Sequence, residues 1–228
     1  MYLHPLIAQL PQKERVALVQ RSELRSYRRN ETLLTANEWS NHVYCVASGP
    51  LRVVAPPVPG GGADVTTDFI HQDDFFLSPA FNEDSFQATQ TLIAALPSSV
   101  YLVPISAMRN LCAAYPSVAL CLLGMALKRM ASMRGQLQRI SSLSSEDLVT
   151  RVLRQLTYLA PAGTGSSGYD KRITQSVIAS YSGLSREVVN KTMRDLESRG
   201  LVRREEDGVH VSAEFASTDF TSLQAMAL

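Results

Sequence analysis

The sequence predicts an α+β fold: a small N-terminal antiparallel β-roll, then one long helix, then a block of short helices that ends in a β-hairpin. Three observations predict it. Short apolar runs alternate between residues 24 and 103, an unbroken helical pattern follows Pro116, and two short helical patterns flank Gly183. Because the period of apolar residues distinguishes strands from helices, these patterns divide the chain into residues 1–115, 116–143 and 144–228.

The first part consists of short apolar runs joined by turns, with a helix expected before them near Pro11–Arg21. Asn30 and Asn37 stand where strand pairs must reverse, and asparagine tolerates left-handed backbone better than most residues. Residues 56–62 are rich in proline and glycine and cannot form an interior strand, so we expect a mobile hairpin tip there. The predicted strands include Val43–Ala47, Leu51–Val54, Asp68–Ile70, Thr91–Leu96 and Val100–Val103.

The middle helix, from Pro116 to about Ile140, carries a heptad repeat. Apolar residues recur at spacings of three and four, which is the pattern of a helix that packs along a second helix. This repeat predicts a parallel homodimer, whereas a single amphipathic core helix is the alternative. The seam consists of Leu123, Ala126, Met130, Met133, Leu137 and Ile140. Lys128, Arg129, Arg134 and Arg139 lie off the seam, and Leu120, Leu122 and Leu127 are expected to pack back onto the roll.

The last part begins with a capped helix at Leu148–Leu159, preceded by a Ser-Ser-Glu-Asp sequence. A second, short helix follows Thr174, which we expect to cap it, and Ala179 is small where two helices would cross. Gly183 supplies the backbone freedom that a tight turn demands, and Leu184 is expected to fill the core beneath that turn. These features predict a helix-turn-helix.

Ser185 is expected to cap the next helix, which has two different faces. Val188, Val189, Thr192, Met193 and Leu196 are expected to face inward. The outer face carries Arg186, Glu187, Asn190, Lys191 and Arg194, whose side chains suit base edges and phosphates. Residues 201–211 alternate around an acidic centre and predict a β-hairpin wing. This part is therefore predicted to bind double-stranded DNA, and a helical hairpin that binds no DNA is the alternative.

Charge is distributed unevenly along the chain. The net charge is only +1, but residues 171–204 carry eight basic and three acidic side chains, and residues 205–228 carry five acidic and no basic ones. A basic block in a near-neutral protein predicts a local anionic partner.

Composition bounds the class of protein. Hydrophobic residues make up 45% of 228 and charged residues 19%, which allows a sizeable core. We expect a cytoplasmic protein with no membrane segment, because no apolar stretch reaches 18 residues and the N-terminus lacks a signal pattern. Three scattered cysteines predict neither a disulfide framework nor a metal site. The loop carboxylates Asp73, Asp74, Glu83 and Asp84 have no accompanying nucleophile, so they are expected to be solvated and the chain is not expected to be an enzyme.

The order of roll, helix and helix-turn-helix resembles the CRP/FNR transcription regulators over nearly the whole chain. The family's Ser-Arg-Glu motif stands here as Ser185-Arg186-Glu187, and its further arginine is matched by Lys191. The resemblance implies phosphate contact by Ser185, base reading by Arg186, Glu187 and Lys191, and a palindromic site near TGTGA-N6-TCACA. Thr174 is counted with the predicted DNA-binding residues. The resemblance also implies a homodimer, with RNA polymerase as a partner if the protein is an activator. Lysine removes the bidentate fork of arginine, which leaves the base read at Lys191 open.

The roll itself resembles a cyclic-nucleotide-binding domain at residues 30–34 and 43–53. The family's Gly-Glu pair and following Arg-Ser/Thr are missing from the corresponding stretch 74–89, and no arginine lies between Arg52 and Arg109. A buried cyclic phosphate without a cation is costly, so cyclic AMP is not expected to bind in the usual way. The residues that we consider for an effector are Ser78, Gln87, Thr89, Arg129 and Arg134.

Several alternatives for the effector stay open. A ligand that uses a different face, such as cyclic di-GMP in some relatives, is one, and constitutive DNA binding without a ligand is another. His42, His71 and Cys45 are isolated, so haem is not expected, and no cysteine precedes Cys45 to hold an iron–sulfur cluster. The rival function is a nucleotide-sensing interaction module that no longer reads DNA.

Overall fold

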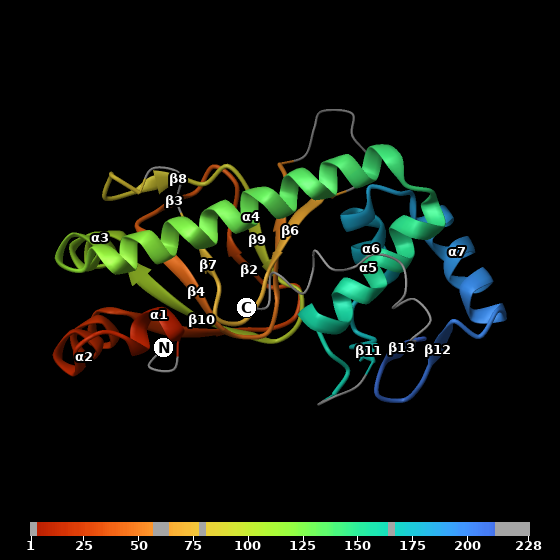
Figure 1. The fold of residues 1–228 in the computed structure, drawn as a ribbon, viewed down its shortest axis with the longest axis horizontal. Coiled ribbons are helices and arrows are strands. Elements are labelled where there is room, and N and C mark those ends of the chain that lie inside the picture. The colour runs from red at the N-terminus through yellow and green to blue at the C-terminus, as the bar shows by residue number, and fades with distance from the viewer. Residues whose placement is uncertain (1–3, 57–63, 78–80, 164–166, 213–228) are drawn as a thin grey trace. The chain divides into compact units, whose positions relative to one another are not determined.

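The computed structural model describes residues 4–56, 64–77, 81–163 and 167–212. The chain forms two compact units, Met1–Arg129 and Met130–Leu228, and the boundary falls within the long helix α4 (Pro116–Ser142; Figure 1). The predicted α+β architecture is confirmed. The predicted hairpin tip falls mostly outside the described residues, as does the effector candidate Ser78.

The first unit is an antiparallel roll made of two four-stranded sheets and one strand pair. The first sheet has the strand order β1 (Glu23–Tyr27), β10 (Ser98–Pro104), β4 (His42–Ser48), β7 (Phe75–Phe76). The second sheet has the strand order β2 (Thr32–Leu34), β9 (Thr91–Ala94), β5 (Leu51–Val54), β6 (Thr66–Ile70). The separate pair consists of β3 (Trp39–Ser40) and β8 (Phe86–Gln87). Asn30 and Asn37 have φ values of 64° and 71°, which confirms the predicted left-handed turns.

Three helices of this unit flank the strands: α1 (Pro5–Ala8), α2 (Gln12–Arg21) and α3 (Ile105–Ala114). Only α2 was predicted. Helix α1 has four residues, which is too short for a periodic signal, and α3 begins after Pro104, which makes no side-chain capping bond. The core that the helices cover includes Leu51, Ile70 and Met108.

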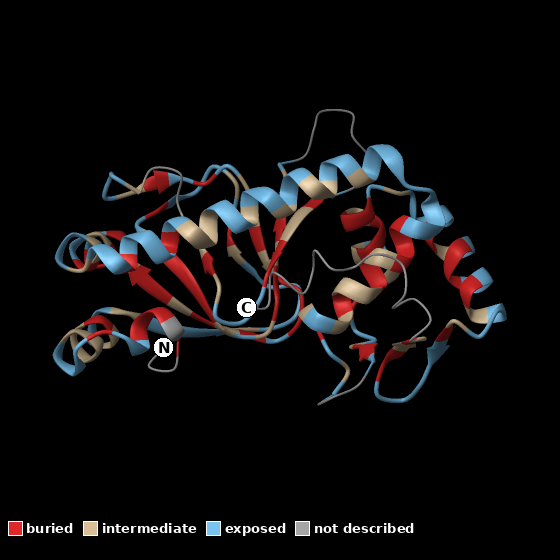
Figure 2. Ribbon diagram, viewed as in Figure 1, coloured by how far each residue is buried: buried red, intermediate tan, exposed pale blue. Residues whose placement is uncertain are grey.

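Helix α4 packs on the roll through Val118, Leu122 and Met125, while much of its remaining surface is exposed (Figure 2). The prediction that Leu120 and Leu127 pack back onto the roll is wrong, because they are 68% and 54% exposed. Leu120 and Leu122 lie two residues apart, which is about 200° around a helix, so they cannot share one face. Leu120 and Leu127 instead widen the exposed apolar stripe.

The second unit contains the helices α5 (Ser145–Leu159), α6 (Gln175–Ser182) and α7 (Arg186–Ser198) and a small sheet of β11 (Gly168–Tyr169), β13 (Val209–Val211) and β12 (Val202–Arg204). The predicted cap of α5 is confirmed, because the Ser144 hydroxyl accepts a hydrogen bond from the Asp147 amide at 3.2 Å. Strand β11 was not predicted, since it has two residues beside a Gly/Ser loop and its strand partner is the distant β13.

Among the described residues, no single helix is long and apolar enough to cross a membrane. Helices α3 and α4 pass that test only as a pair, which is bent by 118°.

Candidate nucleic-acid interface and sensing roll

The turn between α6 and α7 is built as the sequence predicts. Gly183 adopts a left-handed conformation, with φ 75°, and its N–H donates to the Ala179 carbonyl at 3.1 Å. A residue with a side chain is strained in this region, so glycine fits the turn best. The Ser185 hydroxyl then accepts a hydrogen bond from the Val188 amide at 3.3 Å and caps α7. Leu184 is half-buried, so it fills the core beneath the turn only in part.

Helix α7 is strongly two-sided. Val189, Thr192, Met193 and Leu196 are buried at spacings of three and one, which places them on the face toward α5 and α6. Val188 is 37% exposed, contrary to the prediction that it faces inward. It lies in the first turn at the edge of this stripe, where the helix has not yet reached its packing partners. The opposite face is left to polar side chains.

The predicted DNA-contacting residues are all accessible to a partner. Asn190 is half-buried, and the other six are exposed: Thr174, Ser185, Arg186, Glu187, Lys191 and Arg194. Thr174 occupies the N-cap position of α6, but its side chain makes no capping bond, so it caps the helix only through its carbonyl. The N-termini of α6 and α7 both favour an anion, because their first amides and the helix dipole are positive.

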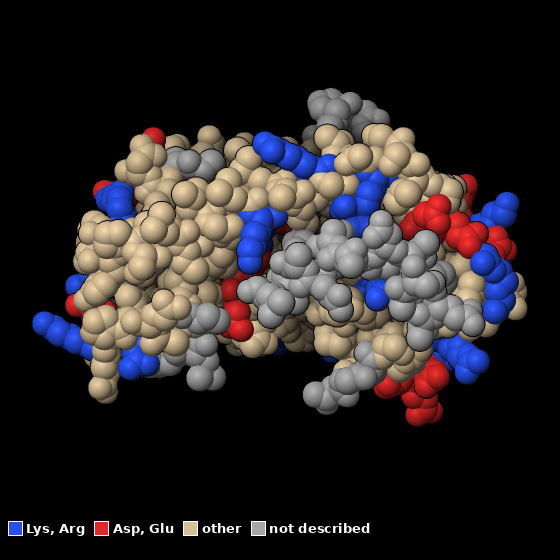
Figure 3. All heavy atoms as spheres, in the orientation of Figure 1, with Lys and Arg blue, Asp and Glu red and all other residues tan. Residues whose placement is uncertain are grey.

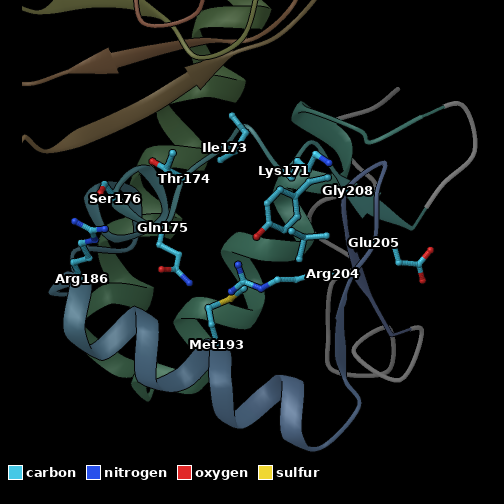
Figure 4. Close-up of a pocket in the computed structure, with 12 residues that line it drawn as sticks. Lys171, Ile173, Thr174, Gln175, Ser176, Arg186, Met193, Arg204, Glu205 and Gly208 are labelled. Atoms are coloured by element: carbon cyan, nitrogen blue, oxygen red, sulfur yellow. The ribbon is translucent and has the colours of Figure 1, made fainter.

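A cleft of about 410 Å³ in this unit brings together α6, the start of α7 and the wing (Figure 4). Thr174 and Arg186 line it together with Lys171 and Arg204, which the sequence analysis had not singled out. In Figure 4, Arg204 extends toward Met193 and Gln175. The basic block 171–204 contains both missed cations, but charge counting alone could not say which members of the block share a cleft.

The predicted wing is confirmed as the hairpin β12–β13, and its tip is acidic. The Glu205 amide donates to the Gly208 carbonyl at 2.9 Å, which closes a tight turn. His210 lies 2.9 Å from Asp207 and 3.9 Å from Glu205, measured from its Nε2 atom to the carboxylate oxygens. The hydrogen bond to His210 lowers the pKa of Asp207. The contacts of His210 with Asp207 and Glu205 account for the proximity of this group of potential metal ligands.

On the described surface that Figure 3 shows, basic side chains form no uniform patch. On the face shown in Figure 3, Lys and Arg atoms occur beside Asp and Glu atoms. Several basic residues of the second unit are already paired, including Arg172 with Asp170, Arg199 with Glu146 and Arg204 with Glu197. Binding of an anionic partner therefore depends on which cations are placed at the cleft and along α7.

The heptad seam of α4 is largely uncovered in the single chain. Leu123, Met130 and Leu137 are 53%, 48% and 69% exposed, and Met133 and Ile140 are exposed as well, while Ala126 is half-buried. A row of exposed apolar side chains at this spacing is typical of a helix that has a second helix as its partner.

The roll holds Arg129 in a way that the sequence analysis did not predict. The Arg129 guanidinium pairs with Asp68 at 3.0 Å and also with Asp74, and it donates to the Phe75 carbonyl at 2.8 Å. The prediction that Asp74 is a solvated loop carboxylate is therefore wrong, because its side chain is only 18% exposed. Arg129 already has two carboxylate partners, which removes it as a free cation for an anionic effector.

The remaining effector candidates do not gather around Arg129. Gln87 is exposed and donates to the Asn37 carbonyl at 3.0 Å, and Thr89 and Arg134 are exposed. Within the described part of the chain, none of the three pairs with Arg129. The structure thus defines an ion cluster in the roll, and among the described effector candidates Arg129 is the one that belongs to it.

Comparisons with known proteins agree with this architecture. A family model for cyclic nucleotide-binding domains matches residues 24–115, and one for Crp-like helix-turn-helix domains matches residues 150–213. The cAMP-activated global transcriptional regulator CRP of Pasteurella multocida is 22% identical, over 78% of this chain and 85% of its own. A CRP-like cAMP-activated global transcriptional regulator of Mycobacterium tuberculosis is 26% identical, over 86% of this chain and 87% of its own.

Two solved structures share the fold. FixK2 from Bradyrhizobium japonicum has a TM-score of 0.73 at 18% identity, covering 87% of this chain and 97% of its own. The c-di-GMP responsive global regulator CLP of Xanthomonas campestris has a TM-score of 0.72 at 16% identity, covering 88% of this chain and 99% of its own.

The fold and the site define a transcription regulator that joins a cyclic-nucleotide-binding type of roll to a DNA-binding winged helix-turn-helix. The chain belongs to the CRP/FNR family. Because its relatives are regulators of transcription, the prediction that it is not an enzyme is confirmed.

Proposed function

We propose that this protein is a homodimeric regulator that reads a palindromic DNA site with helix α7. The observation that carries the proposal is the polar face of α7, which is exposed along its length and is flanked at its start by a cleft with three cations. A helix that packs on one side and presents Arg, Glu, Asn and Lys on the other fits the major groove. This exposure favours DNA reading over an interaction module that has lost it.

Each predicted residue is assigned a role from its position. Ser185 and Thr174, at the two helix N-termini, bind phosphates. The Ser185 hydroxyl accepts from the Val188 amide and can still donate its own proton, whereas the Thr174 hydroxyl makes no capping bond. Arg186, Glu187 and Lys191 read bases from the first two turns of α7. Asn190 and Arg194 complete the contact surface on the same helix. Lys171 and Arg204 are added as backbone-phosphate contacts from the cleft.

The dimer brings two copies of α7 to one DNA site. The seam Leu123–Ile140 buries its apolar side chains against a second copy, and a two-fold dimer reads a site of matching symmetry. We assign the parts of the chain as sensor (1–115), dimer helix (116–143) and DNA-binding domain (144–228). If the protein activates transcription, RNA polymerase is a further partner. We assign it to the cytoplasm, where its DNA target lies.

The effector is one other than cyclic AMP bound in the usual way. Arg129 is occupied by Asp68 and Asp74, and those two carboxylates oppose the approach of an anion. Cyclic di-GMP is one alternative, since the similar Xanthomonas campestris regulator is described as responsive to it. Constitutive DNA binding is the other.

Fluorescence anisotropy on labelled DNA tests the DNA-binding function. Titrations compare a palindrome of the TGTGA-N6-TCACA type with the same bases in scrambled order, each at several salt concentrations. We expect about 10³-fold or tighter binding to the palindrome, and affinities for both that fall with salt as counterions are released. Equal affinities for the palindrome and the scrambled DNA would contradict sequence reading by α7.

Cyclic AMP is expected to leave DNA binding unchanged. Charge-assisted pairing to phosphate supplies a large share of such affinity, and Arg129, the arginine that α4 places against the roll, is already paired with Asp68 and Asp74. We expect calorimetry to show no binding, or binding in the millimolar range, and the DNA affinity to be the same with and without saturating cyclic AMP. Micromolar binding would show that another cation, with Arg134 as the first candidate, closes the site.

A further inference from the structure

We propose that the proton is an effector of the roll and that Asp68, Arg129 and Asp74 form the site that responds to it. The proposal deepens the function proposed above, because it names a signal for the sensing domain of a DNA-binding regulator. It is argued from the contacts of the cluster, from its burial and from the helix that carries Arg129.

The three side chains form one compact ion cluster. Arg129 Nε lies 3.0 Å from an oxygen of Asp68, and a terminal nitrogen of Arg129 pairs with Asp74. The other terminal nitrogen donates to the Phe75 carbonyl at 2.8 Å. With one cation and two carboxylates, the cluster has a formal charge of −1 when both acids are ionised. It is therefore suited to take up a positive charge, and the proton is the smallest one.

The cluster connects three separate elements of the first unit. Asp68 lies on β6, which ends one four-stranded sheet, and Phe75 lies on β7, which ends the other. Arg129 comes from α4, so a single guanidinium joins both sheets to the helix. A change in the strength of these contacts acts on how firmly the helix is held to the roll.

Burial makes the charge of Asp68 costly. Its side chain is 19% exposed, and it shares the core-facing side of the sheet with its strand partner Val53. Desolvation raises the pKa of Asp68 to about 6, with Arg129 acting in the opposite direction and Asp74 adding to the rise. The group therefore titrates close to neutral pH in this arrangement.

Other titratable groups face the same region, and their effects on the pH response must be distinguished from that of Asp68. His71, in the turn after β6, favours the ionised form of Asp68. His4, at the start of α1, donates a hydrogen bond from Nε2 to the Asp73 carbonyl at 2.7 Å, and its ring lies tilted against that of Phe75 with 4.6 Å between ring centres. Burial lowers the pKa of His4, which means that the folded roll favours neutral His4. Acidification that protonates His4 therefore destabilises the roll, whereas protonation of Asp68 stabilises it.

The direction of the response follows from linkage. The pKa of Asp68 is higher in this arrangement than the ordinary value of 3.8, which it regains where the carboxyl is hydrated. We call the arrangement in which Arg129 contacts both carboxylates closed, and the one in which Asp68 is hydrated open. A proton therefore binds the closed arrangement more tightly, and acidification from pH 7.5 to 5.0 favours closed over open by about tenfold. Arg129 directly precedes Met130 of the dimer seam, so closing the cluster orders the helix that the dimer needs.

Hydrogen–deuterium exchange of the full-length protein, corrected for the intrinsic pH dependence of exchange, tests the site. We compare the wild type with Asp68→Asn, which leaves His4 and His71 in place. Protection of peptides covering residues 118–133 is expected to rise about tenfold more in the wild type than in Asp68→Asn between pH 7.5 and 5.0. Asp84→Asn is the matched control, because Asp84 pairs with Arg109 in an exposed copy of the same contact, and it should respond as the wild type does.

A second variant guards against failure of the first to fold. Asp74→Asn keeps Arg129 and removes the negative charge that adds to the rise in the pKa of Asp68, so the midpoint of the exchange response is expected to move to lower pH. An unchanged midpoint, or an identical pH response in Asp68→Asn and wild type, overturns the proposal.

Anisotropy with the palindrome then tests whether the proton regulates DNA binding. Between pH 7.5 and 5.5, operator affinity is expected to rise about fourfold more in the wild type than in Asp68→Asn. An exchange response without this difference in affinity overturns the proton as an effector. If the palindrome is not bound at any pH, the proposed function fails, and the exchange measurements still decide whether the cluster is a proton site.

Discussion

Met130→Glu is expected to give a folded monomer that binds a palindromic operator at least about 100-fold more weakly than the wild type. Met130 is 48% exposed in the single chain, so glutamate there costs the fold little. In a dimer the two carboxylates would face one another within an apolar seam, where an unpaired charge is expensive. Each monomer then reads one half-site, and the gain from holding two α7 helices on one DNA is lost.

Sedimentation velocity at micromolar concentration measures the assembly, and anisotropy measures the operator affinity. Ala131→Glu places the same carboxylate one residue away, on an exposed position outside the seam, and should leave both unchanged. A dimer that persists in Met130→Glu would mean that the exposed seam of α4 is not the interface.

The sequence predicted the elements that local chemistry specifies. The turn glycine at 183, the Ser144 and Ser185 caps and the left-handed asparagines depend on neighbours within a few residues, and all are as expected. Strand β11 and the helices α1 and α3 were missed because they lack such local signals. The two sheets of the roll depend on pairings between distant strands, so their order could not be obtained from periodicity.

The same difference between local and long-range interactions explains which site residues could be predicted from the sequence. The face of α7 follows from helical spacing within one element, which is why the exposure of Arg186 and Lys191 could be predicted. The Asp68–Arg129–Asp74 cluster brings Arg129 of a helix to two carboxylates that lie 61 and 55 positions before it in the sequence. Asp74 looked like a solvated loop carboxylate because nothing near it in the sequence shows its partner. Lys171 and Arg204 were missed for the same reason, since the fold of the wing places them at one cleft.

Arg186→Ala and Glu187→Ala are each expected to weaken specific binding by about 1–3 kcal/mol, or roughly 5- to 150-fold, with little change on scrambled DNA. Both side chains are exposed at the start of α7, so their loss should not unfold the domain. An arginine that bonds two atoms of one guanine loses its contribution only where that guanine is present. A glutamate that accepts from a cytosine amino group behaves likewise, and since it also repels phosphates, its removal should slightly strengthen non-specific binding.

Arg199→Ala is the matched control for charge. Arg199 lies at the opposite end of α7 and pairs with Glu146 of α5 at 2.5 Å, so its removal takes away the same charge without touching the proposed reading surface. Anisotropy on palindromic and scrambled DNA, at one fixed salt concentration, compares the three variants with the wild type. The ratio of the two affinities should fall for Arg186→Ala and Glu187→Ala and stay constant for Arg199→Ala. An equal loss on both DNAs would assign Arg186 to the phosphate backbone, because only a base contact distinguishes one sequence from another.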